Sequence, residues 1–173
     1  AIDQKHIRTE FVAKRADVLL MAIVAEGARK RVYLSPNSQM EFIARSAKTV
    51  WFPDLAMNQD CPDLLSGRGY GFKYWHELFT SRQLVALTTF SDIVGEARER
   101  IYQDALAVGM KNAEKGIDSS GTGAKAYAEA VSVYLAFAVD KSSVYWSSQC
   151  PWLNQAKNEI VGNAFGRQAL PMM

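Results

Sequence analysis

Residues 81–112 carry apolar side chains at the three-and-four spacing of one long α-helix, which commits the chain to a helical framework. The start of this helix is marked, because Thr80 can cap it and Gln83, three residues later, can complete a capping box. The span corresponds to roughly eight turns. Its apolar register consists of Leu84, Leu87, Val94, Ala97, Ile101, Ala105 and Val108.

A second long helix is predicted for residues 124–146, after a Gly- and Ser-rich connector at 116–123. It is apolar on more than one side, so we expect it to be the central and most buried helix. The longest nearly apolar run of the chain, residues 130–139, lies within it. That run is too short to span a bilayer, and no membrane partner is predicted.

The remaining elements are short. Two apolar runs around Gly27 predict a small β-hairpin near residues 18–34, and Asn37 with Ser38 can start a helix behind it. A further short helix is expected at 155–161. The fold class is therefore mainly α: a single helical domain over residues 1–173 with two long helices and one hairpin.

The composition is that of an ordinary globular protein. The chain has 173 residues, 49% of them hydrophobic, and 20 Lys and Arg against 18 Asp and Glu. This excludes collagen, bulk disorder and a disulfide scaffold. Cys61 and Cys150 match no metal-binding spacing, so we interpret them as reduced thiols of a cytoplasmic protein.

No catalytic constellation is visible in the sequence. His6 and His76 are isolated and are interpreted as structural. The glycine series at 67–71 lacks the Lys-Ser/Thr of a phosphate-binding loop. It predicts either a plain turn or a backbone approach to nucleic-acid phosphate assisted by Arg68.

The densest positive spot is Arg29-Lys30-Arg31 at the expected hairpin tip. A basic turn can contact backbone phosphates, although a merely solubilising turn has the same composition. Arg82 falls in the first turn of its helix, where free N–H groups also favour phosphate. Two groups of aromatic residues, at 70–79 and 145–152, fit either base stacking or core packing.

Three segments carry a resemblance to a known family. RVYLSP at 31–36, the stretch at 70–94 with its LFT-x-RQL-x-AL-x-TFSD pattern, and FGRQALPM at 165–172 resemble a family of large bacterial adenine-specific DNA methylases with an N-terminal domain of unknown function. The resemblance implies N6-adenine methylation of DNA with S-adenosylmethionine on a Rossmann-like fold. It covers most of the chain from residue 22 onward.

The catalytic motifs of that family do not stand in this sequence. Neither its Phe-x-Gly-x-Gly donor loop nor its Pro-Pro-aromatic loop occurs, so no catalytic, cofactor-binding or metal residue is assigned. S-adenosylmethionine is implied only for the parent enzyme. We expect an excised accessory or target-recognition domain, inactive alone and joined to the remaining methyltransferase domains. The alternative is a non-catalytic helical scaffold that docks methyltransferase halves or a partner protein. The residues predicted to contact DNA are Arg29, Lys30, Arg31, Arg68 and Arg82.

Overall fold

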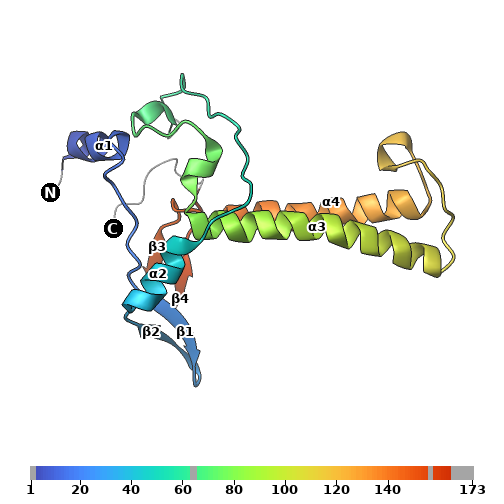
Figure 1. The fold of residues 1–173 in the computed structure, drawn as a ribbon, viewed down its shortest axis with the longest axis horizontal. Helices are drawn as coiled ribbons and strands as arrows, with labels where there is room; N and C mark the ends of the chain where they lie inside the picture. The colour runs from blue at the N-terminus through green and yellow to red at the C-terminus, as the bar shows by residue number, and fades with distance from the viewer. Residues whose placement is uncertain (1–2, 63–65, 156–157, 165–173) are drawn as a thin grey trace. The chain divides into compact units, whose positions relative to one another are not determined.

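The computed structural model describes residues 3–62, 66–155 and 158–164. The chain divides into two compact units. Unit 1 combines residues 1–85 with 147–173, and unit 2 is the continuous segment 86–146. The predicted mainly α class is confirmed: helices dominate the described residues, and the strands form only two small sheets (Figure 1).

The two long helices are α3, Ser81–Ala107, and α4, Ala124–Ser143, which lie side by side in unit 2 (Figure 1). The predicted capping box opens α3. The Thr80 N–H donates to Oε1 of Gln83 at 2.8 Å, and the Gln83 N–H donates to Oγ1 of Thr80 at 3.4 Å. Two otherwise orphaned N–H groups are thereby satisfied.

Helix α3 ends five residues before the predicted boundary at 112. Gly109 adopts a positive φ of 91°, its N–H donates to the carbonyl of Leu106, and the Met110 N–H donates to that of Ala105. These two bonds form a Schellman motif, which a glycine in the left-handed region closes. Helix α4 ends at Ser143, three residues before the predicted boundary at 146.

The second long helix has more buried residues than any other helix in the described ranges, as expected, but several of its large side chains are exposed. Only three small residues of α4 are buried, Ala124, Ala126 and Ala128, whereas Tyr134 is 76% and Phe137 60% exposed. Within the described part of unit 2, α3 is the one long helix beside α4. One neighbour cannot cover a helix that is apolar on several sides.

Unit 1 contains the short elements. Helix α1 spans Gln4–Val12 and α2 spans Ser38–Ser46, where Oδ1 of the N-cap Asn37 accepts the Met40 N–H at 2.9 Å. The predicted hairpin is present as antiparallel strands β1, Ile23–Gly27, and β2, Lys30–Leu34. It begins later than expected, since residues 18–22 form no strand.

The helix predicted for residues 155–161 is also wrong. Strands β3, Trp152–Gln155, and β4, Asn158–Val161, pair antiparallel with Trp152 opposite Val161. Each strand is only four residues long, and apolar β-formers supply its paired ends. The FGRQALPM segment at 165–172 lies outside the described residues.

The core of unit 1 surrounds Leu78, which is 2% exposed and packs with Met57 and Tyr70. Phe72 and Trp75 pack against this core. They belong to the aromatic group at 70–79, which was predicted either to stack on bases or to fill a core. For these two side chains, core packing is what the structure shows. Segments far apart in sequence close over it. The hydroxyls of Ser147 and Ser148 each donate to the Leu78 carbonyl at 2.8 Å.

Candidate nucleic-acid interface

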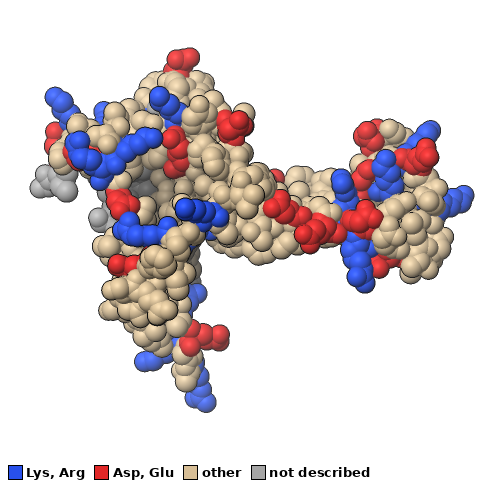
Figure 2. All heavy atoms as spheres, in the orientation of Figure 1, with Lys and Arg blue, Asp and Glu red and all other residues tan. Residues whose placement is uncertain are grey.

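The tip of the first hairpin presents two free cations. Ala28 and Arg29 connect β1 to β2, and Arg29 adopts a positive φ of 64°. Arg29 and Lys30 are exposed, and neither forms an ion pair with a carboxylate in the described part of the chain. Figure 2 shows their end of the hairpin capped by basic side chains.

A close approach of the strands fixes the tip. A Cβ at Gly27 would lie 2.5 Å from Cγ2 of Val32 and 3.0 Å from the Lys30 carbonyl oxygen. Only glycine therefore fits at the last position of β1 without displacing β2. The cations that follow are held on a defined turn.

Strand β2 of the same hairpin is hydrogen-bonded to the second hairpin of unit 1. Arg31 Nη1 donates to the Glu159 carbonyl at 2.5 Å, and the Tyr33 hydroxyl donates to Oε2 of Glu159. This hydrogen bond to a carboxylate raises the pKa of Tyr33 above its ordinary value. The Tyr33 and Trp152 rings meet edge to face, with centroids 6.4 Å apart. Arg31, although exposed, is thus hydrogen-bonded within the described part of the chain, unlike Arg29 and Lys30.

Arg68 lies on a different element, the short 3-10 helix η1 at Ser66–Arg68, and is half-buried. The glycines after it form a turn, with Gly69 and Gly71 at φ values of 81° and 82°. Tyr70 between them belongs to the core. The segment is therefore a packed turn, and its loop lies apart from the hairpin tip (Figure 1).

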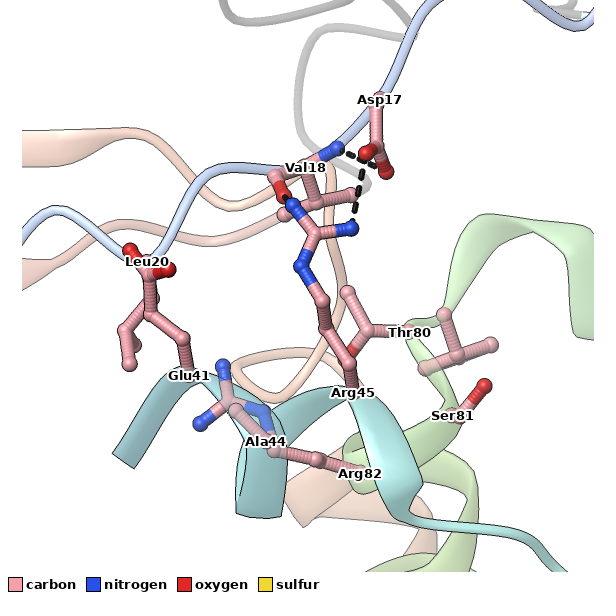
Figure 3. A pocket seen from close by; sticks show the side chains of 10 residues that line it. Asp17, Val18, Leu20, Glu41, Ala44, Arg45, Thr80, Ser81 and Arg82 are labelled. Carbon is pink, nitrogen blue, oxygen red and sulfur yellow. Dashed lines mark hydrogen bonds and ion pairs between the residues drawn. The ribbon is translucent and has the colours of Figure 1, made fainter. Parts of the chain in front are cut away.

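Arg82 borders a polar cavity of about 340 Å³ at the start of α3 (Figure 3). Arg45 of α2 lies at the same cavity and donates through Nη1 to Asp17 at 2.8 Å. The hydrogen bond from Arg45, followed by that from the Val18 N–H, lowers the pKa of Asp17. Glu41 also lines the cavity, so two cations face two carboxylates and the site has no net charge favouring phosphate.

The five predicted DNA-contacting residues therefore do not form one cluster. Arg29, Lys30 and Arg31 adjoin on the hairpin, while Arg68 and Arg82 belong to other parts of unit 1 (Figure 1). Charge nevertheless divides between the units. Unit 1 carries 14 basic and 10 acidic side chains and unit 2 carries 6 and 8, which gives +4 and −2. Any electrostatic attraction to nucleic acid is expected from unit 1.

Sequence reasoning missed an apolar groove between α3 and α4. The groove, about 340 Å³ in volume, is closed at one end by Trp146, whose ring centroid lies 5.7 Å from that of Phe90. The sequence did contain a sign of this groove. The second long helix was predicted to be apolar on more than one side, and too few other helices were predicted to cover all of these sides. The groove is lined by Phe90, Ile93 and Ala97 of α3 and by Leu135, Ala138 and Val139 of α4.

No group of three His, Cys, Asp or Glu side chains in the described ranges is arranged to hold a metal ion. His76 Nδ1 donates to the Pro53 carbonyl at 2.9 Å, and its ring lies between Phe52 and Tyr74. These contacts are those of a structural histidine. Cys61 and Cys150 are not joined in a disulfide bond.

Comparisons with known proteins give no family assignment: no protein-family model, curated protein or solved structure matches the chain. The resemblance to adenine-specific DNA methylases thus rests on its sequence motifs alone and stays a prediction. Of the helices in the described ranges, none combines the length and the apolar character needed to cross a membrane.

Proposed function

We propose that this chain is a DNA-contacting accessory domain of an S-adenosylmethionine-dependent N6-adenine DNA methyltransferase, with the catalytic motifs on other parts of the enzyme. The observation that carries the proposal is the pair of exposed, unpaired cations Arg29 and Lys30 on a fixed hairpin tip. The motif resemblance supplies the enzyme class, and the +4 charge of unit 1 supplies the sign of the interaction.

The hairpin suits contact with the phosphate backbone for two physical reasons. Adjacent cations at a narrow tip reach neighbouring phosphates, and their binding releases condensed counterions. The bracing of β2 through Tyr33 and Glu159 holds the tip before DNA arrives, which lowers the ordering cost of binding. Phosphate contacts fix position rather than sequence, so the tip orients the enzyme on its substrate.

A salt series tests the role of the tip. Binding of the full chain to a fluorescein-labelled 20-base-pair duplex is followed by anisotropy, for wild type and for Arg29→Ala/Lys30→Ala. Loss of two phosphate contacts is expected to flatten the slope of log K against log salt by about 1.8. The matched control is Arg98→Ala/Arg100→Ala, which removes two exposed cations of α3 and should leave the slope unchanged.

Two results would contradict the proposal. One is a slope that the hairpin variant does not change, and the other is no DNA binding at tens of micromolar protein in low salt. Incubation with labelled S-adenosylmethionine and DNA tests the accessory assignment separately. Since no catalytic motif stands in the sequence, the purified chain is expected to incorporate no methyl group.

A second candidate function is favoured by the groove on unit 2. A scaffold needs an apolar surface to dock a neighbouring protein surface, and exposed apolar patches of several hundred Å² mark such sites. The groove and the exposed rings of Tyr134 and Phe137 are of this kind. Docking and DNA contact involve different units, so one chain accommodates both.

A further inference from the structure

We propose that unit 2 pairs with unit 2 of a second copy of this chain across a two-fold axis. This names the partner for the docking role proposed above and rests on it. The surface has two parts on one helix pair: the apolar groove, and an aromatic stripe that we define as Tyr127, Tyr134 and Phe137 of α4.

The protruding part and the hollow part adjoin on α4. Tyr134 lies four residues before Ala138, on the same face of α4, and Ala138 lines the groove. The rings of Tyr134 and Phe137 lie edge to face with centroids 6.5 Å apart, so they project as one feature. In a two-fold contact, the same patch faces itself, and each copy's rings enter the other's groove.

The charge pattern favours a copy of the same chain over a charged partner. No ionisable side chain occurs between Glu129 and Asp140 except the phenol of Tyr134, so the part of the stripe formed by Tyr134 and Phe137 presents no charge that repels its own copy. A nucleic acid or a strongly charged peptide would find no ion pair here to offset its desolvation. An uncharged aromatic surface gains most from an equally apolar one.

The exposed area is sufficient for a pair. Phe90 and Trp146 at the groove and the three rings of the stripe are between 38% and 76% exposed. At about 200 Å² per aromatic side chain, this amounts to roughly 500 Å² per copy. Two copies then cover about 1,000 Å² before any aliphatic side chain is counted, which reaches the threshold of a specific interface.

Sedimentation equilibrium of the full chain without DNA tests the pairing between 1 and 200 µM. Wild type is expected to show a concentration-dependent monomer–dimer equilibrium. Tyr134→Glu/Phe137→Glu places two charges in the stripe of each copy and should weaken the dimer at least tenfold. Phe137→Ala, which adds no charge, should weaken it in the same direction. The control Val108→Glu alters an 81% exposed residue beyond the end of α3 and should leave the dimer unchanged.

Tyr134 and Phe137 are exposed in the monomer, so we expect each variant to remain folded. Circular dichroism of the helical signal and thermal melting check this. A wild-type chain that stays monomeric at 200 µM overturns the inference. A dimer that persists in the folded double variant overturns it as well, and so does a monomer whose groove binds another methyltransferase domain. A monomer that still binds DNA through the hairpin overturns the pairing alone and leaves the DNA-contact proposal standing.

Discussion

Units 1 and 2 are built in opposite ways. Unit 2 is one continuous segment of two helices and their connection, so its contacts form between neighbours in sequence. Unit 1 joins segments that are far apart: Ser147 bonds to Leu78, 69 residues away, and Tyr33 bonds to Glu159, 126 residues away. Closing such loops costs chain entropy, which buried contacts must repay.

The two units also expose different chemistry. Unit 1 buries the large apolar side chains Met57, Tyr70 and Leu78 and carries the excess of positive charge. The residues that unit 2 buries are small or of medium size, while it leaves the rings of Tyr134 and Phe137 outside. The comparison indicates that a buried core specifies unit 1, whereas unit 2 is a helix pair with an exposed apolar groove.

The largest expected effect distinguishes the two units by burial alone. Leu78→Ala removes a fully packed side chain and should lower the free energy of unfolding by about 2–5 kcal/mol. Phe137→Ala removes a larger but mostly exposed ring and should cost less than about 0.5 kcal/mol in the monomer. Urea denaturation at low protein concentration, followed by circular dichroism, measures both.

The Leu78 result also tests whether the units unfold separately. Unit 2 is continuous in sequence and holds one of the four tryptophans, so Leu78→Ala should shift the tryptophan fluorescence transition more than the helical signal. If both signals shifted by the same amount, the chain would unfold as one body. The different construction of the two units would then not determine how each of them unfolds.

A pair of glycines sharpens the picture inside unit 2. A Cβ at Gly121 would lie 2.0 Å from the Lys115 carbonyl oxygen, whereas nothing lies within 4 Å of one at Gly95. We expect Gly121→Ala to destabilise by about 2 kcal/mol through overpacking of the connection. Gly95→Ala should stabilise by about 0.5–1 kcal/mol, because alanine favours a helix. If thermal melts gave the same change in stability for both variants, the close packing at Gly121 would not contribute to holding the two helices together.

Local signals predicted the elements best where they were complete within a few residues. The capping box at Thr80 and Gln83 and the cap at Asn37 were both predicted and are present. The early end of α3 also had a local signal, Gly109, which the boundary expected at residue 112 did not take into account. The short strands after Trp152 were missed because four residues do not distinguish a helical from a strand period.

Burial and site geometry were less accessible to sequence. Apolar residues on several sides of α4 predicted a central helix, and only the packing partners decide which sides are covered. The basic tip at Arg29 and Lys30 was predictable from a turn signal. That Arg31 is engaged by the Glu159 carbonyl was not, because the contact joins residues 128 positions apart. The assignment of these cations to DNA stays a prediction.

A carboxylate in unit 1 gives a pH-dependent test. Partial burial pushes the pKa of Glu77 up, but the N–H groups of Lys73 and Tyr74 outweigh it, at 2.5 and 3.0 Å, and leave the pKa below its ordinary 4.5. The charged form therefore stabilises the fold above about pH 4.5, and that contribution is lost as the pH falls below this value. Glu77→Gln should cost about 1–2 kcal/mol at pH 7.

The same variant should differ less from wild type at pH 3, which lies below the ordinary pKa of the carboxyl, because the contribution of the charged form decreases there. Urea denaturation at pH 7 and pH 3, followed by tryptophan fluorescence, measures the two differences. A cost of equal size at both pH values would mean that the loop depends on the shape of Glu77 rather than on its charge.

The smallest effect is expected at the cap of α3. Thr80→Ala removes the acceptor for the Gln83 N–H and should lower the free energy of unfolding by about 1 kcal/mol. Thr80→Ser keeps the oxygen and should remain within about 0.5 kcal/mol of wild type. Because α3 begins in unit 1 and continues into unit 2, the helical signal measured in urea should report the loss. An unchanged midpoint in Thr80→Ala would mean that packing around Leu78, rather than the capping box, fixes where α3 begins.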